Sequence, residues 1–208
     1  MILRSAKTFA SGYILGVLLG LGVKILLPGL YLYLLYLLEQ KVVVQSAIAG
    51  GYSIGILLNN LLASLLCSYG GYLTTQVFLR LRSPGSAAIR RLSFLEKRVR
   101  NLRGENLKFF LSLYTLPFFI LGFNGLVLGF LLILYASRPL EYLSGLFPHG
   151  LFELPAIILA GSIGYSIGEA VFTHRSGLEK EINIRARKHM PRYFLVLFLL
   201  VIGAYLEP

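Results

Sequence analysis

Residues 9–27 read FASGYILGVLLGLGVKILL, and this stretch decides the class of the protein. A helix needs about 20 residues to cross about 30 Å of hydrocarbon, so this stretch is long enough for one crossing. It is too long for the core of a cleavable signal peptide and has no small-residue cleavage site. It therefore predicts an uncleaved membrane-spanning helix that follows Arg4 and Lys7.

The composition extends this prediction to the whole chain of 208 residues. Hydrophobic residues make up 56% of it, charged residues only 14%, and the mean hydropathy is +0.74. An average soluble chain has about 25% charged residues, and a soluble globule of this size could not hide so much apolar surface. The long apolar segments are roughly 9–38, 42–79, 109–136, 151–172 and 192–206.

These segments predict an all-α, polytopic integral membrane helix bundle with about five transmembrane helices, folded as one membrane-embedded domain over 1–208. Segment 42–79 is too long for one untilted helix, so we expect a break near Gly50-Gly51 or Gly70-Gly71. Residues 30–50, which follow Pro28-Gly29, are expected to form an embedded hairpin at the outer boundary, sheltered by protein.

The net charge of +11 comes from basic residues that are concentrated in a few regions of the chain. Basic residues gather at the N-terminus, in 80–108 and in 174–192, and five crossings place all three on one side of the membrane. This is the positive-inside pattern. We therefore expect a multi-pass protein of the cell membrane with a cytoplasmic N-terminus and an outer C-terminus, cytoplasmic loops at 80–108 and 174–191, and no nucleic-acid partner.

Residues 86–103 predict a basic amphipathic helix, because apolar residues recur on one helical face and arginines and lysines occupy the rest. Such a helix can lie on the anionic inner leaflet. Docking to a cytoplasmic or membrane protein is the alternative.

Glycines recur at the four-residue spacing by which membrane helices pack closely. The candidate packing positions are Gly12, Gly16, Gly20, Gly125, Gly129, Gly164 and Gly168. They fit packing inside one bundle, and some of these faces could also form a homodimer, most simply with two-fold symmetry.

Polar residues within apolar segments are the candidate functional positions. Asn59, Asn60 and Asn124 lie deep in their segments, and their amides need partners, either the backbone of a neighbouring helix or a substrate path. Pro148, His149 and Gly150 predict a helix entrance at the outer boundary. Glu153 then falls in the first turn, where a carboxylate can cap the helix or bind a proton or cation.

Motifs typical of zinc proteases, serine hydrolases and phosphate-binding loops are missing. One cysteine and three histidines offer little for a metal site. We expect no enzymatic activity and no cofactor or metal.

Four stretches resemble the stage II sporulation protein M family. FPHGLFELPAIILAGSIGYSIG (147–168) is similar to the PHG-to-Glu motif of that family. ILLNNLLASLL (56–66), LGFNGLVLGF (121–130) and VIGAYLEP (201–208) are similar to its double-Asn helix, its Asn-Gly helix and its closing segment. The basic stretch 80–108 and the compact outer region depart from the family pattern.

The resemblance implies a polytopic membrane protein, and the namesake of the family is a scaffold for a peptidoglycan-degrading complex. Two functions remain open. The first is a non-catalytic membrane protein that organises or scaffolds a membrane or envelope complex. The alternative is a subunit of a transporter or channel for an ion or small solute, because broken helices and deep polar residues often build such sites.

Overall fold

The structure is a computed structural model that describes residues 1–34, 36–37, 40, 52–82, 105–136, 140, 143, 147, 150–170 and 178–206. All secondary structure within these ranges is helical. The elements are α1 (Ile2–Leu26), α3 (Tyr52–Leu65), η1 (Leu66–Gly70), α4 (Gly71–Arg82), α6 (Glu105–Leu134), α8 (Gly150–Gly168) and α10 (Leu178–Tyr205). The prediction of an all-α membrane protein is therefore confirmed at the level of helical class.

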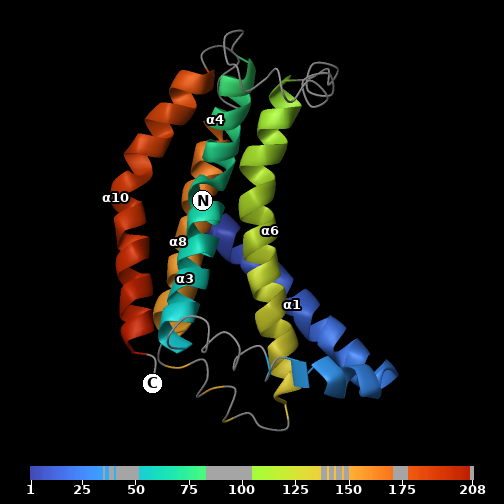
Figure 1. Ribbon diagram of the computed structural model, residues 1–208. Coiled ribbons are helices and arrows are strands. Elements are labelled where there is room, and N and C mark those ends of the chain that lie inside the picture. The colour runs from blue at the N-terminus through green and yellow to red at the C-terminus, as the bar shows by residue number, and fades with distance from the viewer. Residues whose placement is uncertain are drawn as a thin grey trace.

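Three helices are long and apolar enough to cross a membrane: Ile2–Leu26, Leu116–Leu134 and Gly150–Gly168. Two further helical runs lie beside them, one through α3, η1 and α4 and one through α10 (Figure 1). The count of five crossings stays a prediction, since only the first three have both the required length and apolarity.

The first of the two expected break points, Gly50-Gly51, lies outside the described residues, and a continuous helical run extends from Tyr52 to Arg82. At Gly70-Gly71 the helix does not break. It passes through η1, one turn of π-helix, and Gly71 has α-helical angles with φ −63° and ψ −39°. A π turn widens the helix locally and recurs at functional sites.

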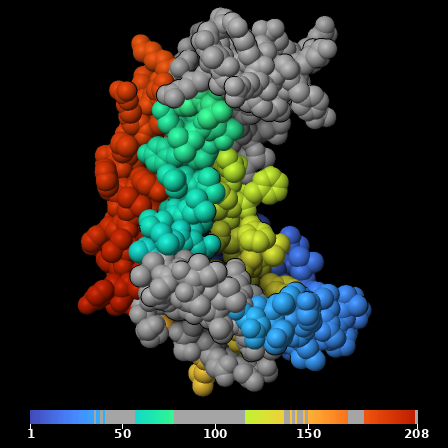
Figure 2. Space-filling model, viewed as in Figure 1, coloured from blue at the N-terminus to red at the C-terminus, as the bar shows by residue number. Residues whose placement is uncertain are grey.

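Helix α8 is the centre of the bundle. Of its apolar window, 56% is buried, against 17% for α1 and 22% for the apolar part of α6. In Figure 2, α10, the α3–α4 run and α6 lie side by side across one face. Because α8 contacts α1, α3, α6 and α10, its side chains meet those of every other long helix.

Helices α1 and α6 cross with their backbones in direct contact, and we call this contact the glycine seam. A Cβ atom at Gly12 or Gly16 would overlap the backbone carbonyl of Gly122 or Leu126. From the other side, a Cβ at Gly125 or Gly129 would overlap the carbonyl of Phe9 or Tyr13. Only glycine allows this approach, so the spacing of small residues positions α1 on α6.

Other predicted packing positions are also used inside the chain. A Cβ at Gly20 would lie 2.9 Å from the Cβ of Ile133, and one at Gly164 would overlap the carbonyl of Cys67. Gly168 is buried at the end of α8. Gly20 and Gly164 therefore pack within one chain, and the homodimer stays a prediction.

The predicted outer hairpin at 30–50 lies mostly outside the described residues. Its beginning, residues 28–34, is helical and turns back towards the end of α6 (Figure 1). The hydroxyl of Tyr31 donates a hydrogen bond of 2.7 Å to the carbonyl of Leu134, and the ammonium of Lys24 lies 5.6 Å from the centre of the Tyr31 ring. The predicted amphipathic helix at 86–103 lies outside the described residues.

Candidate functional site

The candidate site begins at the N-terminal end of α8. Gly150 is the first residue of the helix and is buried, and Glu153 follows within the first turn. Pro148 and His149, which the sequence also singles out, lie outside the described residues. The carboxyl group of Glu153 is thus the ionisable part of the motif that the structure describes.

Glu153 reaches across to helix α3. The side chain of Asn60 on α3, which is 7% exposed, lies beside the Glu153 carboxyl group as a hydrogen-bonding neighbour. The Oε1 atom of the same carboxyl is buried and has no hydrogen-bond partner. Glu153 therefore lies beside α3 with one buried oxygen that has no hydrogen-bond partner among the described residues.

The other two asparagines are placed differently. Asn59 is exposed on the surface of α3. On α6, the amide of Asn124 donates a 2.8 Å hydrogen bond to the carbonyl of Ile120, four residues earlier in its own helix. Of the three asparagines, only Asn60 is brought to Glu153, and Gly125 beside Asn124 belongs to the glycine seam.

Two further polar pairs connect α10 to α3 and to α8. The hydroxyls of Ser64 on α3 and Tyr193 on α10 are 3.5 Å apart. The Nε2 atom of His189 on α10 lies 2.7 Å from the hydroxyl of Ser166 on α8. We call the three pairs, Asn60–Glu153, Ser64–Tyr193 and Ser166–His189, the polar seam.

His189 is the second ionisable residue of the polar seam. It is 6% exposed, and its Nδ1 atom is buried without a hydrogen-bond partner. Burial is the largest cause that lowers the pKa of His189 below 6.5, and the positive charges of Arg192, Lys188 and Arg185 lower it further. The imidazole is therefore neutral near pH 7.

Arg185 and Glu169 lie next to His189. The Arg185 guanidinium donates to the carbonyl of Ser166 at 3.1 Å and to the Glu181 carboxylate at 2.7 Å, and it lies 3.8 Å from the Glu169 carboxylate. These contacts fix the first half of α10, residues 178–191, to the C-terminal end of α8.

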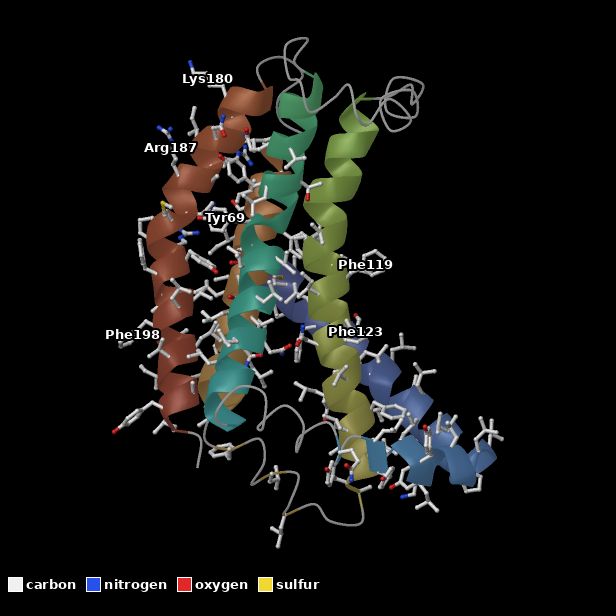
Figure 3. All side chains as sticks on the ribbon, in the orientation of Figure 1. Tyr69, Phe119, Phe123, Lys180, Arg187 and Phe198 are labelled. Atoms are coloured by element: carbon white, nitrogen blue, oxygen red, sulfur yellow. The ribbon has the colours of Figure 1, made fainter. Side chains whose placement is uncertain are left out.

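A second group of contacts fixes α10 to η1 and α4. The hydroxyl of Tyr69 donates to the carbonyl of Ala186 at 3.1 Å, and Tyr69 lies between the two helical runs in Figure 3. Tyr72 and Gln76 both donate to the Asn183 side chain, at 3.0 and 2.9 Å. Residues 178–191, expected as part of a cytoplasmic loop, are thus a helix that is packed along one side.

Sequence reasoning missed His189, Ser166 and Tyr193. One signal was available for two of them, since His189 and Tyr193 are one helical turn apart, as are Asn60 and Ser64. The concentration of positive charge in 174–191 favoured a loop and hid this pattern.

The described side chains include no group of three or more His, Cys, Asp or Glu that could hold a metal ion. What the arrangement offers instead is two ionisable groups, the half-buried Glu153 and the buried His189, each with one buried atom that has no hydrogen-bond partner among the described residues. Such groups can exchange a proton or bind a small ion.

The comparisons with known proteins agree with the motifs. No curated protein and no solved structure matches the chain. The family model described as Stage II sporulation protein M matches residues 8–207, which include the glycine seam and the polar seam. On this match, the chain belongs to the stage II sporulation protein M family.

Proposed function

We propose that the chain is a non-catalytic integral membrane protein that organises a membrane or envelope complex. The observation that carries the proposal is the part of α10 before the apolar segment 192–206, residues 178–191, which is helical and packed along one side. Tyr69 and Tyr72 hold one side of it through hydrogen bonds to Ala186 and Asn183. A helix fixed in this way can present its other side to a partner without a large entropy cost.

That other side combines basic and apolar residues. Lys180, Arg187 and Lys188 are exposed, Ile184 is 50% exposed and Met190 is 55% exposed. Figure 3 shows Lys180 and Arg187 pointing away from the bundle. Opposite charge steers and orients association, so the surface suits an acidic protein segment that also carries apolar side chains.

A photo-crosslinking amino acid at position 187 tests this proposal in native membranes. We expect a protein adduct that is lost when Lys180→Glu and Lys188→Glu reverse the charge. The same crosslinker at Phe198, which is 62% exposed and points away from the bundle in Figure 3, is the lipid-facing control. Adducts with lipid alone at both positions would contradict the docking surface.

The proposed topology has a cytoplasmic N-terminus and an outer C-terminus. It is supported by the position of the basic residues of α10 at the end opposite to Tyr205 (Figure 1). In a Cys67→Ala background, a cysteine at Lys180 should react with a membrane-impermeant reagent only from the cytoplasmic side, and one at Tyr205 only from outside. Reaction of both from one side would refute the scheme.

The polar seam favours a second candidate, a subunit of a transporter or channel. Intramembrane polar residues commonly mark ion paths, and the Ser64–Tyr193 pair and the neighbouring Asn60 and Glu153 lie within apolar segments of α3, α8 and α10. Flux of protons or cations into liposomes that contain the protein tests it. Flux that Asn60→Leu abolishes and Asn59→Leu leaves intact would favour transport over the organising role, and flux equal to that of empty liposomes would exclude transport.

A further inference from the structure

We propose that the bundle contains a hinge at the level of η1, where the helices can bend and one half of the protein can move against the other. The proposal goes beyond the proposed function, because it concerns movement within the chain and holds for an organising protein and for a transporter. It rests on helix irregularities that the packing brings to one level: the π turn η1, Pro117 in α6, Gly164 in α8 and Pro191 in α10.

The π turn, Pro117 and Gly164 touch one another. Cys67 lies within η1, and its Sγ atom is 3.9 Å from the carbonyl oxygen of Pro117. A Cβ atom at Gly164 would overlap the carbonyl of Cys67 and would lie 2.7 Å from the Pro117 ring. Three helical runs are therefore irregular at the point where they are in closest contact.

Pro191 lies at the same level on α10. The hydroxyl of Ser64, just before η1, is 3.5 Å from the hydroxyl of Tyr193. The hydroxyl of Tyr69, within η1, donates to the carbonyl of Ala186 at 3.1 Å. Because residue numbers rise along one helical run as they fall along the other, these two contacts place Pro191 opposite the beginning of η1.

The irregularities lower the cost of bending at this level. Proline has no backbone N–H, so Pro117 cannot donate to the carbonyl of Leu113, and Pro191 cannot donate to that of Arg187. Helices bend at prolines and at π turns. On α8 the contact is made through Gly164, which has no side chain to repack when the helices rotate slightly against each other. Each helical run therefore bends more easily here than along its regular turns.

On one side of this level, the glycine seam fixes α1 to α6. Its contacts on α6 extend from Gly122 to Ile133, all of them beyond Pro117. The hydroxyls of Thr8 on α1 and Tyr165 on α8 are 3.0 Å apart, next to the hinge, where bending displaces atoms least. We call this side the α1 half, and it consists of α1 and residues 52–65, 118–134, 150–163 and 192–205.

On the other side, hydrogen bonds join the remaining parts of the helices. The Asn183 side chain accepts from Tyr72 and Gln76 on α4, at 3.0 and 2.9 Å. The Arg185 guanidinium donates to the carbonyl of Ser166 on α8 at 3.1 Å. This α4 half consists of α4 and residues 105–116, 165–170 and 178–190. It carries the basic surface of α10, so bending at the hinge would move that surface relative to α1.

Distances between spin labels test the proposal on the full chain in lipid nanodiscs. Cysteines at the exposed positions Lys180 and Val77 report on the α4 half, and cysteines at Leu21 and Phe198 report on the α1 half. The native Cys67 is 0% exposed and is retained, and the chain without added cysteines is the control for its labelling.

Pairs that join the two halves, Lys180–Leu21 and Val77–Leu21, should give broad or two-peaked distance distributions. Pairs within one half, Lys180–Val77 and Leu21–Phe198, should give a single narrow peak. This contrast is expected because hinge motion changes distances across the hinge and leaves those within each half constant.

Proline variants test whether this level controls the movement. Pro117→Ala and Pro191→Ala allow the missing backbone hydrogen bonds to form, so the broad component of the pairs across the hinge should be lost. Pro155→Ala, in α8 but away from the hinge, is the matched control and should leave the distributions unchanged. Pro191 is exposed and Pro117 is buried, so Pro191→Ala opens no cavity and provides the test if Pro117→Ala destabilises the bundle. An unfolding temperature that is unchanged or higher shows that the lost movement is not lost structure.

Three results would overturn the proposal. Distributions across the hinge as narrow as those within each half would show that the bundle is rigid. Equal broadening of all four pairs would show movement that is not confined to this level. Equal effects of Pro191→Ala and Pro155→Ala on the pairs across the hinge would show that the irregularities at η1 do not control the movement.

Discussion

Two helix interfaces inside the same bundle are held together by opposite means. In the glycine seam, α1 and α6 touch backbone to backbone, at positions where a Cβ would overlap a carbonyl group. In the polar seam, α3, α8 and α10 meet through side-chain pairs such as Ser166–His189 at 2.7 Å. The first interface depends on glycines, which have no side chain, and the second on pairs of polar side chains.

The two interfaces differ in how much their contacts contribute to the association of the helices. A lipid environment supplies no hydrophobic force between helices, so close packing of small residues provides much of their association. Hydrogen bonds between membrane helices contribute less, about 0.6 kcal/mol on average. The polar seam also contains Glu153 and His189, each of which has a buried atom without a hydrogen-bond partner among the described residues.

The largest effect is expected in the glycine seam. Gly16→Ala places a Cβ against the carbonyl of Leu126 and should destabilise the protein by more than about 2 kcal/mol, and Gly16→Leu should prevent α1 from docking. Gly22→Ala on the same helix is the matched control. Its Cβ meets nothing within 4 Å, so the better helix propensity of alanine should leave stability unchanged or slightly raised. Thermal unfolding in detergent measures both.

The same variants test self-association. If Gly16→Leu separates a dimer but leaves the unfolding temperature of the monomer unchanged, the glycine seam joins two chains and the packing of α1 on α6 described above is wrong. Equal effects of Gly16→Ala and Gly22→Ala would also contradict it.

A smaller effect is expected in the polar seam. Ser166→Ala removes the partner of His189 Nε2 and leaves a buried imidazole unpaired, which should cost about 1–3 kcal/mol. Ser162→Ala is the control on the same helix. Among the described residues its hydroxyl bonds only to the carbonyl of Leu159 within α8, so its loss should change the unfolding free energy by a few tenths of a kcal/mol. Equal losses for the two variants would mean that the cross-helix bond contributes nothing specific.

The smallest effect should be a dependence of stability on pH that arises from His189 in the polar seam. The pKa of His189 is lowered in the folded state, mainly by burial and then by Arg192, Lys188 and Arg185. As the pH falls below about 6.5, the unfolded chain binds the proton before the folded protein does, so stability decreases with falling pH until the folded-state pKa is passed. His189→Gln should remove this part of the pH dependence of unfolding. An unchanged pH profile in that variant would show that His189 does not titrate between the two states.

The sequence predicted the glycine seam better than the polar seam, for a physical reason. Four-residue spacing identifies the face of a helix that can approach a neighbour, and glycine has no alternative role on that face. A polar side chain needs a particular partner, and the partner depends on how two helices are rotated against each other. Asn59 and Asn60 are adjacent in sequence, yet one is exposed and the other is buried beside Glu153.

Two local features also escaped sequence reasoning. A π turn inserts one extra residue into a helical turn, so η1 replaced the expected break at Gly70-Gly71 with a continuous helix. The upper part of α10 was expected as a loop because charge indicates the side of the membrane and not the local conformation. Its inward-facing residues, Ile182, Ala186 and His189, are buried and follow helical spacing, and this was the signal available.

The central claim is that Glu153 is held by Asn60 across two helices, and a double-mutant cycle tests it most directly. Unfolding free energies of Asn60→Leu, Glu153→Leu and the double variant should give a coupling energy of about 0.6–1.7 kcal/mol, the range found for hydrogen bonds between membrane helices. The parallel cycle with Asn59→Leu should give zero within about 0.5 kcal/mol. Zero coupling for Asn60, or equal coupling for Asn59 and Asn60, would contradict the pair.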